Sequence, residues 1–267
     1  MNELALFAGA GGGILGGHLL GWRTVCAVEW EPYPASVLCA RQNDGLLPPF
    51  PIWDDVQTFN GFAWRGLVDV VSGGFPCQDI SAAGKGDGLD GARSGMWTHM
   101  ARVVSEIRPQ YVFVENSPML TTRGGTRVVG DLTQMGYDCK WTVMGAADVG
   151  ANHKRDRMWI VGKSKRTGLE GQRSKPGKQK VTQPRDTGPL ADTSDQGDVW
   201  GQWLMGFAEQ EHDIGRGKAD GSRKWWAAEP NVGRVDHGVA ARVDRLKAIG
   251  NGQVPICAAE AWRLLTA

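Results

Sequence analysis

The chain has 267 residues, of which 41% are hydrophobic and 22% charged, and its formal net charge is +1. This composition is typical of a globular protein with room for one large domain, and any surface for nucleic acid must be local. The five cysteines include no Cys-x-x-Cys pair, and no apolar run approaches the roughly 20 residues that span a bilayer. We therefore expect no disulfide framework, no bound metal, no membrane segment, no signal peptide and a cytoplasmic location.

Short apolar runs alternate with helix-like stretches as far as about residue 162, a pattern typical of a parallel α/β sheet. The strands are predicted at residues 3–7, 24–29, 68–72, 111–115, 137–144 and 158–162. Helices are predicted at residues 14–20, 35–41, 95–107 and 127–134, and an amphipathic helix at 254–265. The predicted fold class is α/β, with a mostly parallel sheet and helices on both faces.

The composition changes at Lys163. Between residues 163 and 187 lie eight Lys or Arg residues and two acidic ones, with few apolar residues, which is typical of a loop or of a segment that orders on binding. Tryptophans follow, and we favour a small core for them over packing on nucleic acid. The predicted organisation is a catalytic and cofactor-binding domain at residues 1–162, a short irregular insertion at 163–234, and a segment at 235–267 that completes the first domain.

A glycine-rich loop follows the first predicted strand and opens the first helix. Glycines let the backbone approach a ligand closely, although such loops also serve only to pack a strand on a helix. The loop lacks the Gly-Lys-Ser/Thr ending of a phosphate loop. The second strand ends at Glu29, a position that commonly binds ribose hydroxyls, and Trp30 could stack on adenine; the alternative is a solvated glutamate and a packing tryptophan. These features favour S-adenosylmethionine over NAD, with the loop residues Phe7, Ala8, Gly9, Ala10, Gly11 and Gly12 as ligands.

Three further segments carry side chains suited to chemistry. Cys77 lies on a Gly-Gly-Phe-Pro turn after a predicted strand, where an α/β protein displays a nucleophile. Glu115 ends the apolar strand 111–115, so it should share the carboxyl edge of the sheet with Cys77. Arg155 and Arg157 precede the strand 158–162, and alternation along an extended chain would place both on one side. Singly, these residues could be a core cysteine, a capping glutamate and a solvated basic pair; together and in this order they predict an active site.

These motifs, in this order, resemble the cytosine-C5 DNA methyltransferase family of bacterial and phage type, over about residues 2–162 and 235–265. The resemblance rests on the loop at 7–12, Glu29-Trp30, Gly74-Phe75-Pro76-Cys77-Gln78 with Ser81, Val114-Glu115-Asn116, Arg155-Asp156-Arg157 and Gly250-Asn251-Gly252-Gln253-Val254-Pro255. The chain departs from the family pattern at Ser117, which replaces valine, and at His153 and Lys154, which replace glutamine and arginine.

The resemblance implies a methyl transfer from S-adenosylmethionine to C5 of a cytosine flipped out of double-stranded DNA. Cys77 would add to C6, Glu115 would protonate N3, and Arg157 with Arg155 would hold O2. It adds further cofactor contacts at Asp55, Val56, Pro76, Asn251, Gly252 and Gln253, and substrate contacts at Gln78, Ser81, Asn116, Lys85 and Arg93. It also implies a Rossmann-like fold, target recognition by the insertion, a monomer, and a restriction-modification setting in a bacterial cell or phage-infected host.

Three other functions compete with this interpretation. A tRNA cytosine-C5 methyltransferase is disfavoured because no Cys-Phe-Thr element occurs in the insertion. A catalytically inactive DNA-binding relative is disfavoured by the intact Cys77, Glu115, Arg155 and Arg157, although the short insertion and the changes at His153 and Lys154 keep it open. A nicotinamide-dependent oxidoreductase fits the glycine spacing poorly.

Overall fold

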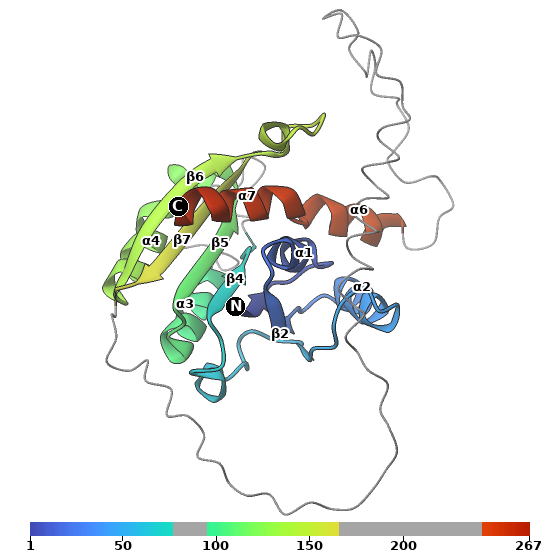
Figure 1. Cartoon of the computed structure of the whole chain (residues 1–267), viewed down its shortest axis with the longest axis horizontal. Helices are drawn as coiled ribbons and strands as arrows, with labels where there is room; N and C mark the ends of the chain where they lie inside the picture. The colour runs from blue at the N-terminus through green and yellow to red at the C-terminus, as the bar shows by residue number, and fades with distance from the viewer. Residues whose placement is uncertain (77–94, 166–241) are drawn as a thin grey trace, which may run out of the picture. The chain divides into compact units, whose positions relative to one another are not determined.

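A seven-stranded sheet organises the chain in the computed structural model, which describes residues 1–76, 95–165 and 242–267 (Figure 1). The strand order is β3-β2-β1-β4-β5-β7-β6. The strands are β1 (Asn2–Leu6), β2 (Arg23–Val28), β3 (Ile52–Trp53), β4 (Val70–Gly73), β5 (Tyr111–Asn116), β6 (Tyr137–Met144) and β7 (Arg157–Ser164). The pairs β1–β2, β1–β4, β2–β3 and β4–β5 are parallel, whereas β7 pairs antiparallel with both β5 and β6. The predicted mostly parallel sheet is confirmed.

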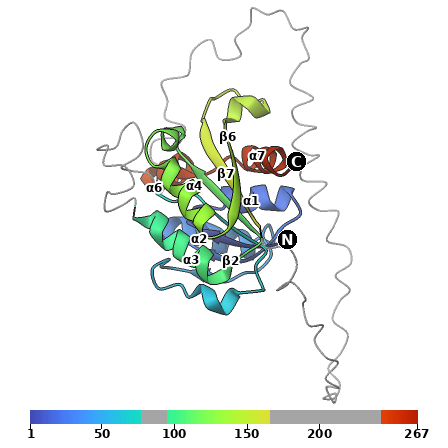
Figure 2. The ribbon, with the colours of Figure 1, turned by 90° about the vertical axis from the view of Figure 1, so that its left-hand side faces the viewer.

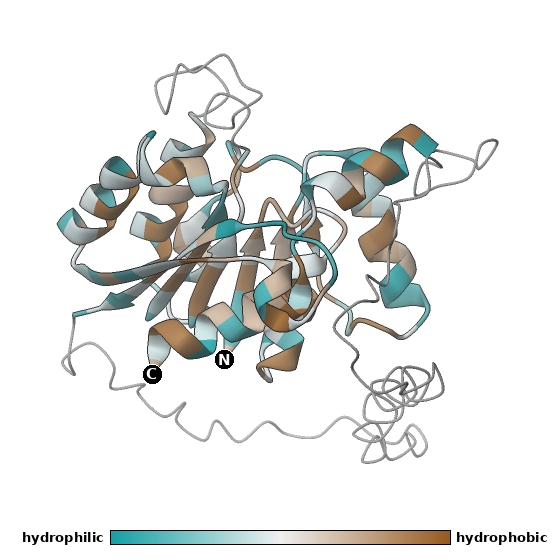
Figure 3. Ribbon diagram, turned by 90° about the horizontal axis from the view of Figure 1, so that it is seen from above, coloured by the Kyte–Doolittle hydropathy of each residue, from teal (hydrophilic) through white to brown (hydrophobic). Residues whose placement is uncertain are grey.

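Helices cover both faces of this sheet, as predicted (Figure 2). The α-helices are α1 (Gly12–Leu19), α2 (Pro32–Asn43), α3 (Met96–Ile107), α4 (Gly125–Gln134), α6 (Arg242–Asn251) and α7 (Pro255–Thr266). Short 3-10 helices are η1 (Gly61–Trp64), η3 (Pro118–Thr121) and η4 (Ala146–Val149). Helices α3 and α4 pack on one face, and α1, α2 and α7 pack on the other. Hydrophobic residues accordingly concentrate on the central strands and the inner helix faces (Figure 3).

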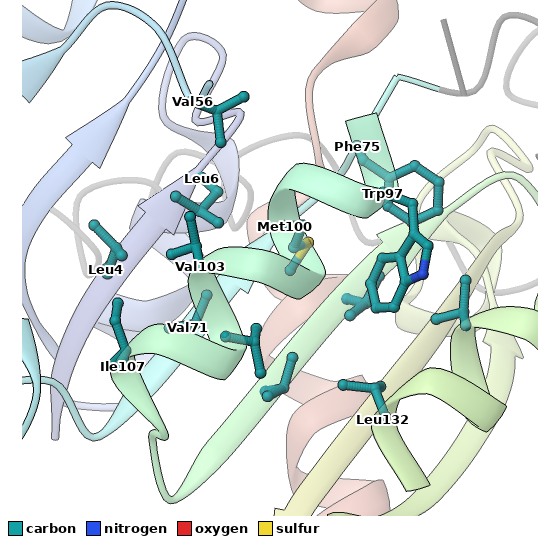
Figure 4. Close-up of a cluster of buried hydrophobic side chains, with 14 of the residues drawn as sticks. Leu4, Leu6, Val56, Val71, Phe75, Trp97, Met100, Val103, Ile107 and Leu132 are labelled. Atoms are coloured by element: carbon teal, nitrogen blue, oxygen red, sulfur yellow. The ribbon is translucent and has the colours of Figure 1, made fainter. Parts of the chain in front are cut away.

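The larger core lies between the sheet and α3 (Figure 4). Trp97, Met100, Val103 and Ile107 recur at helical spacing and are fully buried against the strands. The Nε1 atom of Trp97 donates to Asp131 at 2.7 Å, so its one polar group is satisfied. Burial of an aromatic or aliphatic side chain of this size stabilises the fold by about 1.5–3 kcal/mol. Trp97 also packs against the ring of Phe75, and so holds the chain in place just after the end of β4.

The opposite face is closed by α7, which the sequence pattern predicted at 254–265. Its Trp262 ring lies edge-on to Trp22, with 4.6 Å between centroids, and against Phe113 of β5 at 5.4 Å. Helix α1 approaches α7 closely because Gly16 has no side chain: a Cβ there would lie 2.8 Å from the Cβ of Ala258. Helix α7 therefore packs on the same sheet as the N-terminal strands.

Most predicted elements differ from the observed ones by three residues or fewer at each end, and 137–144 agrees with β6. Among the described elements, those not predicted are β3, which has two residues, α6, which buries none of its side chains, and the three 3-10 helices named above. Strand β7 runs to Ser164, two residues past the predicted domain boundary at 162. The insertion predicted at 163–234 lies, from residue 166 on, outside the described residues, and that boundary stays a prediction. Among the described residues, no helix is long and apolar enough to cross a membrane.

Glu3 is a buried carboxyl whose titration should govern part of the stability. It accepts hydrogen bonds from Thr24 Oγ1 at 2.8 Å and Ser72 Oγ at 2.6 Å, and burial raises its pKa to about 7. The pKa of Glu3 is higher in the folded than in the unfolded chain. The free energy of unfolding is therefore highest below the unfolded pKa, and it falls as the pH rises through about 7. Between pH 4.5 and 8.5 the wild type should lose on the order of 3 kcal/mol of its free energy of unfolding through Glu3, and Glu3→Gln should not show this loss.

The measurement is urea unfolding of both proteins across that pH range. Glu260→Gln, which changes an exposed carboxylate on α7, is the matched control and should retain the wild-type dependence. Parallel pH profiles for wild type and Glu3→Gln would contradict the assignment.

Candidate functional site

A pocket opens at the carboxyl ends of β1 and β4, where the strand order reverses direction. Ligands of open α/β sheets bind at such a switch point. The pocket is lined by Ala5, Leu6, Phe7, Ala8, Gly9, Gly13, Ile14, Ser72, Gly73, Gly74, Glu115, Asn251, Gly252 and Gln253. It therefore joins the predicted glycine loop, the predicted acid and the late Gly-Asn-Gly-Gln segment, which are far apart in the sequence.

The glycine loop reverses the chain between β1 and α1 through left-handed backbone conformations. Phe7, Gly9 and Gly11 have φ of +52°, +55° and +93°. A non-glycine residue pays a conformational penalty in this region, and such residues cluster at functional sites. Gly11 precedes α1 without any side-chain cap, so the first N–H groups of the helix remain available to a ligand.

Glu29 holds the loop in place from the end of β2. One carboxylate oxygen accepts from the Gly9 N–H at 2.7 Å and the other from the Glu31 N–H at 2.7 Å. Burial raises the pKa of Glu29, while these two N–H donors lower it. The adjacent Trp30 is 71% exposed, so its indole is available for stacking. The predicted role of Glu29 toward ribose stays a prediction; its contacts add a structural role in shaping the loop.

The late turn packs directly on the backbone of the glycine loop. A Cβ at Gly12 would collide with the carbonyl of Gln253, lying 3.1 Å from its carbon, and one at Gly13 would lie 2.5 Å from Gln253 Oε1. A Cβ at Gly74 would collide with Glu115 and lie 3.0 Å from Gln253 Nε2. The clash at Gly12 is with backbone and excludes any larger residue, whereas a Cβ at Gly13 or Gly74 would displace the Gln253 or Glu115 side chain.

Glu115 occupies the centre of this arrangement at the end of β5. It is 8% exposed; its Oε1 lies 2.8 Å from Arg157 Nε, and its Oε2 accepts from Gln253 Nε2 at 3.4 Å. Burial is the largest influence and raises the pKa of Glu115, against the lowering effect of Arg157 and Arg155. A carboxyl whose pKa is raised in a pocket keeps a proton that it can donate at a higher pH than a free carboxyl can.

Asn116 anchors the segment that leads to the predicted nucleophile. Its Nδ2 donates to the Phe75 carbonyl at 3.1 Å, and its Oδ1 accepts from the Ser117 N–H at 2.8 Å. Phe75 is buried, with its ring 5.5 Å from Trp97. The predicted substrate contact of Asn116 stays a prediction; in the structure its side chain holds the Phe75 carbonyl, two residues before Cys77.

The two arginines predicted to act together have different partners. Arg157 begins β7 and contacts Glu115 at the edge of the sheet where the active site is predicted. Arg155 has φ of +43°, and its Nη2 donates to the carbonyls of Ile249, Gly250 and Gly252. The alternation expected for an extended chain does not hold at Arg155, because it precedes β7 and is left-handed. The structure places its guanidinium on the late turn.

The remaining predicted residues divide into three groups. Asp55 caps its own turn through the Gln57 N–H at 2.8 Å, and Val56 is buried in the core, so neither side chain lines the pocket. Pro76 is exposed at the edge of the described segment. Outside the described residues lie Cys77, Gln78, Ser81, Lys85 and Arg93. Sequence reasoning placed Gly73 and Gly74 in the turn before Cys77 but did not predict that they, or Ser72, line the pocket.

The chemistry of the lining fits a nucleoside ligand. None of the described residues that line the pocket is lysine or arginine; most are glycine or apolar, and the polar side chains are one hydroxyl, one buried carboxyl and two amides. An uncapped helix start can bind a carboxylate, and the exposed Trp30 beside Glu29 suits a base and ribose. In the described residues, no group of three His, Cys, Asp or Glu side chains could hold a metal ion.

Fold and pocket together define a doubly wound α/β protein with a nucleoside-type site at its switch point. The family model for C-5 cytosine-specific DNA methylase matches residues 1–226. Type II methyltransferase M.CviJI from Paramecium bursaria Chlorella virus IL3A is 32% identical over 162 residues, and M.NgoBI from Neisseria gonorrhoeae is 34% identical over 167. Each alignment covers 60% of this chain, and 42% and 50% of the respective relative. The structure of the Entamoeba histolytica methyltransferase EhMeth matches 61% of this chain and 52% of its own, with TM-score 0.52 and 15% identity, which shows the fold alone.

The chain belongs to the C-5 cytosine-specific DNA methylase family. It spans half or less of the length of the two curated relatives above. The family and the Rossmann-like fold inferred from the motifs are thereby confirmed.

A methyl group at Gly12 should lower the stability of the protein, because it would clash with the turn that closes the pocket. Gly12→Ala forces a Cβ against the Gln253 carbonyl, and overpacking of this kind costs about 1–3 kcal/mol. Thermal unfolding should show a lower midpoint for Gly12→Ala. The matched control is Gly130→Ala in α4, where a Cβ meets nothing within 4 Å and should stabilise the helix by about 0.5–1 kcal/mol. Equal stability of the two variants would refute the packing argument.

Proposed function

We propose that this protein is a DNA (cytosine-5)-methyltransferase that transfers a methyl group from S-adenosylmethionine to C5 of a cytosine in double-stranded DNA. One observation carries the proposal: Glu115 is buried between Arg157 and Gln253, at the wall of a pocket formed by the glycine loop. The family and the type II methyltransferase relatives support the same chemistry.

The cofactor would lie in the switch-point pocket. Gly9, the first N–H groups of α1 and the 251–253 turn would hold it, with Glu29 at the ribose and Trp30 at the base. When bound, S-adenosylmethionine supplies an electrophilic methyl group on a positively charged sulfur. The absence of lysine and arginine among the described lining residues fits this cation, because no like charge from the lining would repel it.

Cys77 would act as the nucleophile. Asn116 holds the chain just before it, by donating a hydrogen bond to the Phe75 carbonyl. The thiolate adds to C6 of the flipped cytosine, forming a C–S bond, and the ring electrons move toward C5 and N3. Glu115 donates a proton to N3, and Arg157 stabilises charge at O2. C5 would then take the methyl group of bound S-adenosylmethionine, with the S–CH3 bond breaking and the sulfur leaving as the neutral thioether of S-adenosylhomocysteine. Loss of the C5 proton to solvent, return of the N3 proton to Glu115 and cleavage of the C–S bond would then restore the aromatic ring and free Cys77.

The DNA substrate must deliver its cytosine out of the stack, because C5 and C6 lie inside the duplex. The basic stretch after Lys163 would neutralise phosphates, with Lys85 and Arg93 as further phosphate contacts, and the insertion at 163–234 would read the target. Gln78 and Ser81 complete the proposed substrate contacts. The protein would act as a monomer, in the cytoplasm of a bacterial cell or phage-infected host, in a restriction-modification setting like that of its type II relatives.

The first prediction for this function is methylation that depends on Cys77. Wild type should transfer labelled methyl groups to mixed-sequence duplex DNA, and bisulfite sequencing should locate C5-methylcytosine in one sequence context. Cys77→Ala should lower the rate by about 10⁴-fold or more, because the covalent route is lost. Cys39→Ala, at an exposed cysteine of α2, is the matched control and should remain active. Methylation of tRNA in place of DNA, or no methylation with cofactor bound, would overturn the proposal.

The second prediction concerns the pH dependence of the chemical step. Because burial raises the pKa of Glu115, the residue keeps its proton to a higher pH than a free carboxyl, and the single-turnover rate should fall above that pKa. Glu115→Gln should lower this rate by about 10²–10⁴-fold and abolish the alkaline fall. A Glu115→Gln rate within a few-fold of wild type, with the same pH profile, would exclude Glu115 as the acid.

A further inference from the structure

Helix α6 lies beside the pocket without an apolar anchor. None of its ten residues is buried, and Val243 and Ile249 are 75% and 53% exposed. Hydrophobic burial, which normally holds a short helix on a domain, is therefore largely missing here. Among the described residues, polar links hold α6 in place. One is the ion pair of Lys247 Nζ with both carboxylate oxygens of Glu31, at 2.6 and 2.7 Å.

The second link is Arg155, at the carboxyl end of the same helix. Its Nη2 donates to the carbonyls of Ile249 at 3.2 Å, of Gly250 at 2.8 Å, and of Gly252. The last carbonyls of a helix have no partner within the helix and carry partial negative charge, so a cation there is favourable. Arg155 also keeps a left-handed backbone, a strain that its surroundings must offset.

The turn that Arg155 holds is part of the pocket wall. Asn251, Gly252 and Gln253 line the pocket, and Gln253 packs on the backbone of Gly12. The Gln253 side chain also donates to Glu115. A displacement of this turn would therefore open the cofactor pocket and remove one hydrogen bond from the acid, without any change at the glycine loop itself.

We propose that Arg155 is a positioning residue that acts through the 250–253 turn, and that it does not hold the cytosine base. This inference rests on the proposed function and refines it: of the two arginines, Arg157 faces Glu115, and Arg155 builds the wall that binds the cofactor. The division follows from their partners, since Arg157 Nε contacts Glu115 and the Nη2 of Arg155 is directed at three carbonyls.

The test measures binding of S-adenosylhomocysteine by calorimetry in the absence of DNA. Arg155→Ala should weaken this binding by about tenfold or more, the ratio expected from a lost charge-assisted hydrogen bond. Arg155→Lys, which keeps the charge but not the fork, should recover part of the affinity. At saturating cofactor, the single-turnover rate of Arg155→Ala should stay within about tenfold of wild type. Unchanged affinity for S-adenosylhomocysteine with a large loss of rate at saturating cofactor would overturn the proposal. It would support a contact between Arg155 and the cytosine instead.

Two controls separate this inference from its alternatives. Arg263→Ala removes an exposed arginine of α7 that pairs with Glu260, and it should bind the ligand as wild type does. Amide hydrogen exchange on Arg155→Ala, or on Arg155→Lys should the alanine variant fail to fold, should accelerate at residues 249–254. Unchanged exchange there would also overturn the proposal. A wild-type protein that binds no S-adenosylhomocysteine would instead refute the proposed function.

Discussion

The site depends on one close approach, that of the 251–253 turn to the backbone of the first glycine loop. Gln253 lies so near Gly12, Gly13 and Gly74 that a Cβ at any of the three would collide with it or with Glu115. This contact joins the two ends of the chain and makes a single pocket from them. Under the proposed function, Gln253 would therefore couple cofactor binding to acid catalysis, because its side-chain amide reaches Glu115 and its backbone packs on the glycine loop.

Charge within the site is divided among elements that the contact brings together. Glu115 is buried, which raises its pKa, and Arg157 keeps the carboxyl oriented without fully offsetting that effect. The balance suits a group that must hold a proton and then release it. Glu29 is also a buried carboxyl, but its contacts in the structure are structural. It accepts hydrogen bonds from two backbone N–H groups and so shapes the glycine loop. The shape of the glycine loop thus depends on backbone geometry that a neighbouring side chain stabilises.

Sequence patterns located most of the fold because its core elements carry strong periodic signals. Helix α3 shows apolar residues at helical spacing, and strand β6 agrees with its predicted range. Strand β3 was missed because two residues have no measurable period, and α6 because a helix that buries nothing has no apolar stripe to detect. The strand direction of β7 also needed the structure, since an antiparallel partner leaves the same apolar run as a parallel one.

By itself, the sequence determined the α/β class, the order of the motifs and the identity of the chemically active residue types, because these depend on local patterns along the chain. The tertiary structure decided which of those residues meet. It directed Arg157 to Glu115 and Arg155 to the late turn, although only Asp156 separates them in sequence, because a left-handed backbone at Arg155 breaks the alternation of an extended chain. It also assigned Asn116 to the Phe75 carbonyl and Val56 to the core. Such partnerships depend on long-range packing, which no local pattern encodes.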